Sequence, residues 1–147
     1  MIVTINGSGK PKGSNSAYFL SLVKHAIRNG SDSDLDYEDF YLSKTDGIRQ
    51  AAQGLLNCAE TCDRIIFAMP LFVDGVPSTI LSFFRRVDSL DESQLLRGKK
   101  VYVIANCGFY EGEQNQILLD TMRCWAEKKG MIWGRGIGCL LYTSRCV

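Results

Sequence analysis

Arg64-Ile-Ile-Phe-Ala-Met69, followed by Pro70, is the stretch of sequence that decides the fold class. The run is too short for a typical helix, and its apolar residues do not alternate with polar ones, which indicates a strand buried on both faces. Such strands belong to parallel sheets, because the helices that connect parallel strands cover the sheet from both sides. We therefore expect residues 64–69 to form a central strand of an α/β protein.

Short apolar runs and amphipathic stretches alternate on both sides of this strand. We expect further strands at residues 2–6, 35–42, 100–105 and 131–137, and helices at residues 16–29, 48–61 and 113–129 and after Pro77. The alternation in residues 35–42 is partly polar, which is typical of an edge strand. The pattern predicts one α/β doubly wound domain with a five-stranded parallel sheet.

Composition and charge exclude several classes of protein. The chain has 147 residues, of which 46% are hydrophobic and 22% charged, as in one ordinary globular domain. Its 17 basic and 16 acidic residues lack the basic excess of a nucleic-acid binder. No apolar run approaches the roughly 18–20 residues of a membrane span, and residues 1–6 lack the features of a signal peptide. We expect a cytoplasmic protein that binds neither nucleic acid nor a membrane.

Cysteine is frequent in this short chain, and its six positions are Cys58, Cys62, Cys107, Cys124, Cys139 and Cys146. Without a signal peptide, they are expected to be reduced thiols. Cys58 and Cys62 form one loosely spaced pair, and the chain has a single histidine, whereas a structural zinc site needs four ligands. We therefore predict no metal site and expect most of the cysteines to be small buried groups.

The loop after the first strand has the composition of a phosphate-binding site. It reads Asn6-Gly-Ser-Gly-Lys-Pro-Lys-Gly-Ser-Asn-Ser16 and leads into a helix. Amide N–H groups at a helix N-terminus lack intrahelical partners, and the helix dipole favours an anion there. Serine hydroxyls can donate further hydrogen bonds, and Lys10 or Lys12 can neutralise charge.

This loop matches neither of two well-known nucleotide-binding motifs. No Gly-Lys-Ser or Gly-Lys-Thr closes it as in a Walker A loop, and Lys12 stands where Gly-x-Gly-x-x-Gly needs its third glycine. The alternative without a ligand is a glycine-rich turn in which Ser14 or Asn15 caps the helix.

Two further loops follow predicted strands, at the edge of the sheet where ligands bind in such folds. Residues 69–77 are apolar and aromatic where a surface loop is usually polar, so they suit a flat aromatic ligand. Alternatively, Leu71, Phe72 and Val73 cover the next helix or form a subunit contact.

The third loop is Asn106-Cys-Gly-Phe-Tyr-Glu-Gly112. Cys107 and Gly108 allow close approach of the backbone to a ligand, and Phe109 and Tyr110 offer stacking surface. A nucleophilic Cys107 would need an activating base or cation, and the single histidine, His25, is expected to face solvent. A phosphate cradle beside two loops suited to a flat ring predicts a mononucleotide with an aromatic head, and flavin mononucleotide (FMN) fits best.

Three motifs in these loops resemble the flavodoxin-like NAD(P)H-dependent FMN reductases and quinone reductases. They are Ser8-x-Lys-x-Lys-Gly-Ser-Asn-Ser16, Pro70-Leu-Phe-Val-Asp74 and Asn106-Cys-Gly-Phe-x-Glu111. The resemblance extends from Met1 to about Gly138, and it departs at Gly9, where many members carry proline. It implies the strand order 2-1-3-4-5, non-covalently bound FMN and a homodimer.

The resemblance also implies the roles of the loops. The first would hold the phosphate and the other two the isoalloxazine, while NADH or NADPH gives a hydride to the flavin, which passes electrons to a quinone, a flavin or another small acceptor. No side chain would act as acid or base, because the flavin carries the chemistry. The candidate FMN-binding residues are Ser8, Lys10, Lys12, Ser14, Asn15, Ser16, Pro70, Leu71, Phe72, Val73, Asp74, Asn106, Cys107, Gly108, Phe109 and Glu111.

Three other functions remain open. A flavodoxin-type electron carrier is usually strongly acidic, and the net charge of +1 argues against it. A cofactor-free module that acts through protein contacts is the second alternative. A protein that binds coenzyme A or a sugar nucleotide is the third, and the apolar second loop suits it less.

The end of the chain departs from the expected pattern. A fold of this kind normally closes with a helix after the fifth strand, but residues 139–147 show no helical stripe. We expect a domain over residues 1–138 and a short tail over 139–147 that is not native to the family, as in a chain truncated before its last helix. Such a chain would expose apolar surface beside its first helix and would be only marginally stable.

Overall fold

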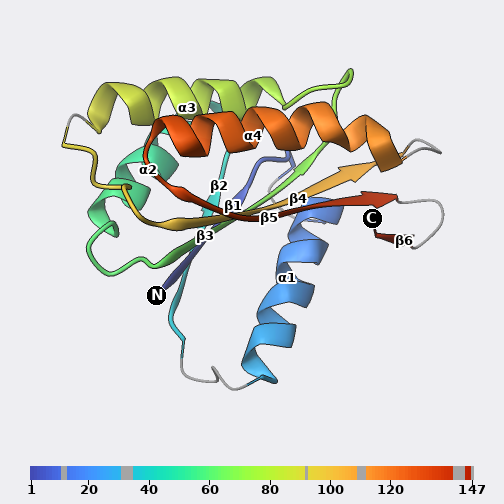
Figure 1. The fold of residues 1–147 in the computed structure, drawn as a ribbon, viewed down its shortest axis with the longest axis horizontal. Helices are drawn as coiled ribbons and strands as arrows, with labels where there is room; N and C mark the ends of the chain where they lie inside the picture. Colours follow the sequence, from blue (N-terminus) through green and yellow to red (C-terminus); the bar gives the residue numbers. More distant parts are fainter. Residues whose placement is uncertain (11–12, 31–34, 92, 109–111, 141–144, 147) are drawn as a thin grey trace.

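Strands and helices alternate along the chain, as the periodicity predicts (Figure 1). The structure is a computed structural model that describes the chain except for residues 11–12, 31–34, 92, 109–111, 141–144 and 147. Its strands are β1 (Ile2–Asn6), β2 (Tyr37–Tyr41), β3 (Arg64–Pro70), β4 (Lys100–Cys107), β5 (Ile132–Leu140) and β6 (Arg145–Cys146). Its helices are α1 (Asn15–Arg28), α2 (Lys44–Asn57), α3 (Ser78–Leu90) and α4 (Gln116–Lys128), with the 3₁₀ turn η1 (Gly112–Asn115) before α4.

The strands form one sheet in the order β2-β1-β3-β4-β5-β6. The first five strands are parallel, and β3 lies between β1 and β4 with Ile65–Met69 buried. The central position expected for residues 64–69 and the strand order 2-1-3-4-5 are therefore confirmed. The two-residue strand β6 pairs with β5 in the antiparallel direction, an addition that the apolar pattern does not predict.

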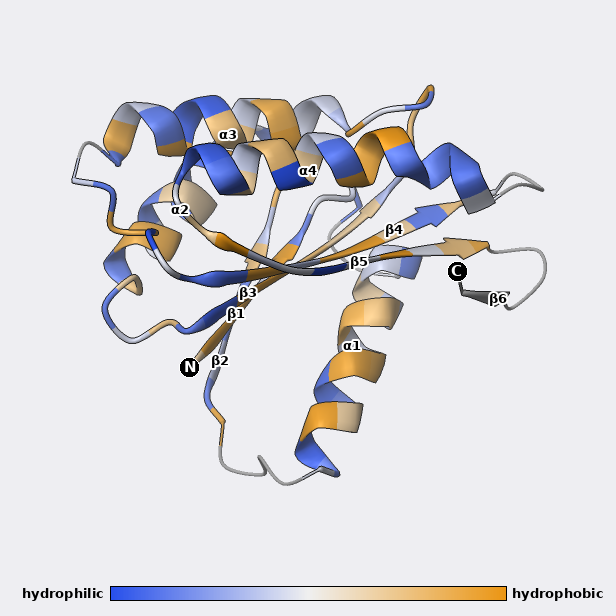
Figure 2. Ribbon diagram, in the orientation of Figure 1, coloured by the Kyte–Doolittle hydropathy of each residue, from blue (hydrophilic) through white to orange (hydrophobic). Residues whose placement is uncertain are grey.

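The two faces of the sheet are covered unequally (Figure 1). Helices α2, α3 and α4 pack on one face and enclose the larger core, in which the rings of Phe67, Phe83 and Trp125 meet at centroid distances of 6.0–6.3 Å. Of the helices that the structure describes, α1 alone packs on the other face, over a smaller cluster that includes Leu20 and Ile66. Figure 2 shows apolar and polar residues alternating around α1, as expected for a helix with one buried side.

Some boundaries differ from the predicted ones. Helix α2 begins at Lys44, four residues before the first apolar residue of its stripe, because a helix also includes polar residues that face solvent. Strand β5 continues through Leu140, beyond the glycine-rich run, because β4 extends to Cys107 and offers it hydrogen-bond partners. Cys139 and Leu140 are buried in the sheet, so the tail expected from residue 139 begins inside a strand. None of the described helices is long and apolar enough to cross a membrane.

Candidate functional site

The carboxyl ends of β1, β3 and β4 meet at one edge of the sheet and surround a hollow. Strand register places Asn6 beside Ala68, and Pro70 beside Asn106. The hollow has a volume of about 430 Å³, within the roughly 300–1,000 Å³ of small-molecule sites. Its lining residues are Ser8, Gly9, Lys10, Gly13, Ser14, Asn15, Ser16, Pro70, Phe72 and Asn106. Gly9 and Gly13 also line the hollow but were not among the candidate residues. The glycine-rich, phosphate-type composition of their loop could have identified them.

Hydrogen bonds from the Asn6 side chain hold the first loop against helix α1. Its Oδ1 accepts from the Ser8 amide (2.9 Å), and its Nδ2 donates to the Ser14 hydroxyl (3.3 Å). The Ser14 oxygen also accepts from the Ala17 amide (3.1 Å), so Ser14, and not Asn15, caps the helix. The loop therefore wraps the N-terminus of α1, where the first helical amides have no intrahelical partner and can bind an anion.

Two glycines, Gly7 and Gly13, are required by the backbone conformation and close packing of this loop. Gly13 has a φ of +69°, which L side chains rarely adopt. A Cβ at Gly7 would lie 2.8 Å from Ile80 Cδ1 and 3.0 Å from Met69 Cβ, so only glycine lets the end of β1 lie this close to α3. The Gly7 carbonyl accepts a hydrogen bond from the Thr79 hydroxyl (3.1 Å), which fixes the loop to α3.

Asn106 joins all three loops. Its Oδ1 accepts from the Ser16 hydroxyl at 3.0 Å, and both side chains are buried. Its backbone carbonyl accepts from the Leu71 amide at 2.9 Å. Because the Ser16 hydroxyl proton is used inside the protein, Ser16 can offer an anion only its amide, whereas the Ser14 hydroxyl accepts both of its bonds and keeps its own proton to donate.

The second loop forms a tight turn that presents one aromatic ring to the hollow. Phe72 and Gly75 exchange two backbone hydrogen bonds of 3.0 and 3.1 Å. Val73 and Asp74 between them have φ values of +46° and +56°, a conformation that is costly for a β-branched residue. Phe72 lines the hollow and is 56% exposed, whereas Val73 and Asp74 do not line it. The side chain of Leu71 is buried in the larger core and does not line the hollow.

The third loop is described only in part. Cys107 is buried, and its sulfur accepts from the Asn115 side-chain amide at 3.2 Å, so the thiol is held away from the hollow. Gly108 is exposed and also does not line the hollow. The candidate residues Phe109 and Glu111, like Lys12 in the first loop, lie outside the described residues.

The hollow offers binding groups but little acid–base chemistry of its own. Among the described residues that line it, Lys10 is the one ionisable group. His25 is exposed on α1, where its ring lies 2.9 Å from the Asn29 side chain. Burial raises the pKa of the Cys62 thiol, and burial with the nearby Glu38 carboxylate raises that of Cys58, but neither residue lines the hollow. No group of three potential metal ligands occurs in the described part of the chain.

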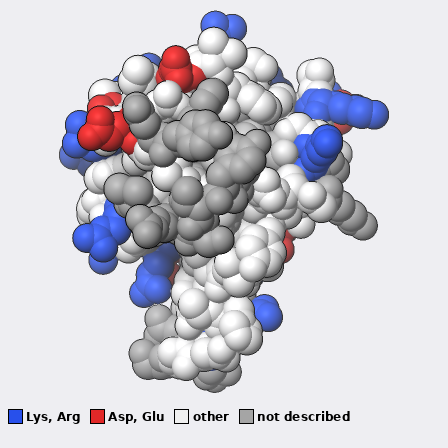
Figure 3. Space-filling model, turned by 90° about the vertical axis from the view of Figure 1, so that its right-hand side faces the viewer, with Lys and Arg blue, Asp and Glu red and all other residues white. Residues whose placement is uncertain are grey.

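Surface charge at this edge is mixed. Figure 3 views the molecule from the carboxyl ends of the strands, and isolated Lys, Arg, Asp and Glu side chains lie around the rim. Uncharged residues occupy most of the described surface in this view. The described residues in this view therefore carry charges of both signs and form no patch of a single sign.

No protein-family model and no curated protein matches the sequence. Solved structures match the fold. The Trp repressor binding protein of Bacillus subtilis is 24% identical over 93% of this chain and 82% of its own, with a TM-score of 0.70. The NADPH-quinone reductase of P. pentosaceus is 18% identical over 92% and 82%, with a TM-score of 0.62. General stress protein 14 of Treponema denticola, solved in complex with FMN, is 12% identical over 92% and 83%, with a TM-score of 0.66.

A flavodoxin of Megasphaera elsdenii also matches, at 17% identity over 92% of this chain and 83% of its own, with a TM-score of 0.64. At these identities the likeness shows the fold, which is flavodoxin-like, as the resemblance implied. It does not transfer an activity or a binding residue to this chain, because one fold can carry many functions.

Proposed function

We propose that this protein is an FMN-dependent NAD(P)H oxidoreductase that passes electrons to a quinone, a flavin or another small acceptor. The observation that supports the proposal is the hollow itself, whose lining combines the N-terminus of α1 and Lys10 with the exposed ring of Phe72. A mononucleotide with a flat aromatic head needs both features. The names of the matching structures, which include an NADPH-quinone reductase and a complex with FMN, support the same class of function.

The residues divide into those for the phosphate and those for the ring. The amides of Asn15 and Ser16, the hydroxyls of Ser8 and Ser14, and the Lys10 ammonium would bind the phosphate. Pro70 and Phe72 would pack against the ring, and Asn106 would hold the loops at the correct separation. We retain Lys12, Phe109 and Glu111 as candidates from the sequence.

FMN, when bound, supplies a ring that accepts a hydride from NADH or NADPH. The chain's own part is to bind and orient. Hydride transfer from a nicotinamide to the flavin would need no protein acid or base, because the flavin carries the chemistry, and Lys10 is the one ionisable group among the described lining residues. Phe72 lines the hollow and is 56% exposed, and a nicotinamide or an acceptor would approach beside its ring. We also propose a homodimer, as the resemblance implies.

The test is a titration of the purified chain with FMN, followed by its visible spectrum. We expect a bound flavin whose absorbance bleaches on anaerobic addition of NADH or NADPH and returns when a quinone is added. A chain that leaves flavin fluorescence and melting temperature unchanged would instead be a cofactor-free module, and the proposal would fail.

A flavodoxin-type electron carrier is the second candidate, because a flavodoxin is among the matching structures. The two functions separate in one assay. A carrier binds FMN but oxidises NAD(P)H only when a partner reductase is added, whereas the proposed enzyme oxidises it alone. The formal net charge of +1 favours the enzyme, because flavodoxin-type carriers are usually strongly acidic.

A further inference from the structure

Asn6 is a buried side chain at the end of β1 that contacts the phosphate loop from behind. It is not among the described residues that line the hollow. Its two polar side-chain atoms bond to the Ser8 amide and the Ser14 hydroxyl, and both serines do line the hollow. One end of a side-chain amide only accepts hydrogen bonds and the other only donates. Asn6 can therefore set the direction in which these bonds run.

The backbone fixes the direction of each bond. The Ser8 amide can only donate, so the Asn6 atom that lies 2.9 Å from it must be the oxygen, Oδ1. The other end of the side chain is then Nδ2, which donates to the Ser14 hydroxyl oxygen at 3.3 Å. The Ala17 amide donates to the same oxygen at 3.1 Å. The Ser14 oxygen thus accepts two hydrogen bonds, which occupy both of its lone pairs.

The Ser14 hydroxyl can consequently offer a ligand only its proton. No hydrogen bond among the described residues takes this proton, and Ser14 lines the hollow. The Ser8 side chain is 8% exposed, and its oxygen accepts from the Lys10 amide at 3.2 Å, so its proton is also available. The Lys10 ammonium and the first amides of α1 are donors as well.

Charged groups near Asn6 do not change this direction. Asn6 also lines a smaller hollow that contains Lys24 and Asp39, and these two side chains form an ion pair with each other. Asp39 accepts a further bond from the Thr4 hydroxyl. In the described part of the chain, neither charged side chain is hydrogen-bonded to Asn6.

We propose that Asn6 is a positioning residue that directs the Ser14 proton into the hollow and so makes the phosphate site select a fully ionised phosphate monoester. The three oxygens of the dianion are strong acceptors, which match a set of donors. The monoanion carries a P–OH proton, for which the Ser14 oxygen has no lone pair left. The inference rests on the proposed function, because it assigns the phosphate of FMN to this loop.

The first test compares FMN with riboflavin, which has the same ring and no phosphate, by fluorescence titration of the full chain. Asn6→Asp keeps the side-chain shape but replaces the donor by an acceptor, which would take the Ser14 proton. It should weaken FMN about thirty-fold and leave riboflavin unchanged within about two-fold. Asn6→Ala adds no acceptor and should weaken FMN only about three-fold. A merely structural role predicts the opposite order, because aspartate resembles asparagine more closely than alanine does.

A Ser14→Ala background separates the hydrogen bond from the added charge. Repulsion between the new carboxylate and the phosphate acts in either background, whereas loss of the donor requires the Ser14 hydroxyl. Asn6→Asp should therefore weaken FMN only about three-fold in the Ser14→Ala chain. Asn57→Asp adds the same charge at the exposed last residue of α2 and is the control. Circular dichroism shows whether each variant is folded.

The second test needs no flavin and uses phenyl phosphate and sulfate as probes in thermal melts. The phosphate monoester takes up a proton as the pH falls through about 6, whereas sulfate stays doubly charged. Stabilisation by phenyl phosphate should decline across this range, and stabilisation by sulfate should not. The decline should be smaller in Asn6→Ala, because the Ser14 oxygen regains a lone pair for the P–OH proton. Lys10, the one ionisable group among the described lining residues, stays charged throughout.

Three results would overturn the inference. They are a larger loss of FMN affinity in Asn6→Ala than in Asn6→Asp, an equal effect of Asn6→Asp with and without the Ser14 hydroxyl, and stabilisation by phenyl phosphate that is independent of pH. The two proposals can fail separately. A chain that shows the phenyl phosphate pattern but does not bind FMN supports the role of Asn6 and overturns the proposed function. A chain that binds and reduces FMN without the pattern does the reverse.

Discussion

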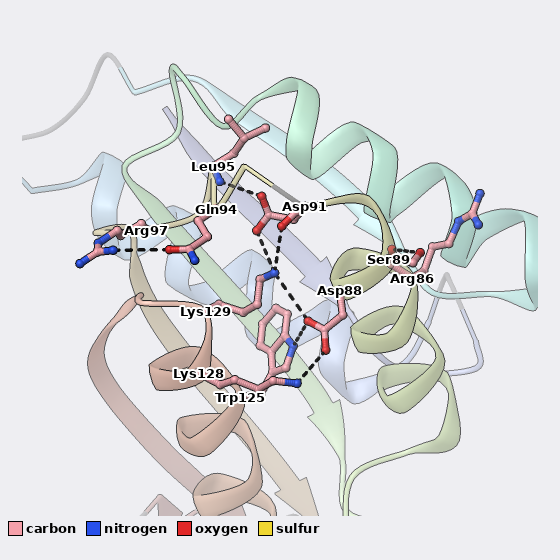
Figure 4. Close-up of polar contacts among 10 residues, drawn as sticks. All are labelled: Arg86, Asp88, Ser89, Asp91, Gln94, Leu95, Arg97, Trp125, Lys128 and Lys129. Carbon is pink, nitrogen blue, oxygen red and sulfur yellow. Dashed lines mark hydrogen bonds and ion pairs between the residues drawn. The ribbon is translucent and has the colours of Figure 1, made fainter.

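The two ends of the sheet both carry polar side chains, but they use their charged groups differently. At the amino ends of the strands, Lys129 lies 3.0 Å from Asp91 and 3.7 Å from Asp88, and both Lys129 and Asp91 are buried (Figure 4). The Trp125 ring nitrogen also donates to Asp88, at 3.4 Å. At the carboxyl ends, Lys10 and the first amides of α1 face the hollow instead.

This difference separates a structural cluster from a binding site. Buried charges that pair with one another are used within the fold, and removing one member leaves the other buried without a partner, which is strongly destabilising. Donors that face a hollow of ligand size stay available. Four predictions test this division, from the largest expected effect to the smallest.

Lys129→Met should lower the free energy of unfolding by about 3 kcal/mol or more, because it leaves the buried Asp91 carboxylate unpaired. The measurement is urea denaturation. Lys128→Met, which removes only an exposed contact to Asp88, is the control and should change stability little. Adding Asp91→Asn to Lys129→Met should restore part of the loss. FMN affinity of the folded variant should be unchanged, and a weakened affinity would contradict the division of the two ends.

Ser14→Ala should lower both the stability of the protein and its affinity for FMN. It removes the helix cap, which costs about 1 kcal/mol of stability, and a phosphate ligand, which should weaken FMN about ten-fold. Ser43→Ala is a matched control, since Ser43 stands at the N-cap of α2 without a side-chain capping bond. Fluorescence titration with FMN and thermal melts measure the two effects. If both variants bind FMN equally well, Ser14 has no place in the phosphate site.

Val73→Asn should stabilise the protein by up to about 1 kcal/mol, because asparagine tolerates positive φ better than a β-branched residue does. Val73 is 96% exposed, so the change removes little packing. Val73→Thr keeps the branch and should give no gain in melting temperature. A gain that is the same for both variants would show that backbone strain is not the cause.

The smallest expected effect is the contribution of the Cys62 thiol to the pH dependence of stability. Burial raises its pKa in the folded state, so the unfolded chain loses this proton at a lower pH than the folded chain. Stability from this group is therefore complete below the ordinary thiol pKa, and it declines as the pH rises through that value. The exposed Cys124 should react with a thiol reagent at once, and Cys62 only as the chain unfolds. Equal reaction rates in the folded protein would contradict this.

Local pattern accounts for much of the fold and for part of the site. The apolar run at residues 64–69 predicted a central strand, because burial on both faces leaves a signature in adjacent residues. The loop of residues 6–16 predicted a phosphate-binding site, because its glycines, serines and lysines are neighbours in the chain and can be recognised together. By contrast, the roles of Leu71 and Phe72 could not be separated, because adjacent apolar residues look alike until one turns into the core and the other toward the hollow.

The sequence by itself therefore determined the alternation of strands and helices, the place of the phosphate-type loop and the single-domain size, all of which depend on residues close in the chain. Only the tertiary structure decided which polar groups form hydrogen bonds or ion pairs within the protein and which remain available to a ligand. The bond between Ser16 and Asn106 spans 90 residues, and the pairing of Lys129 with Asp91 spans 38. Val23 and Ile27 of α1 likewise line one hollow together with residues of β3, β4 and β5. Hydrogen-bond partners and burial depend on which residues the fold brings close together. A local sequence pattern does not show which distant residue will pair with a given donor.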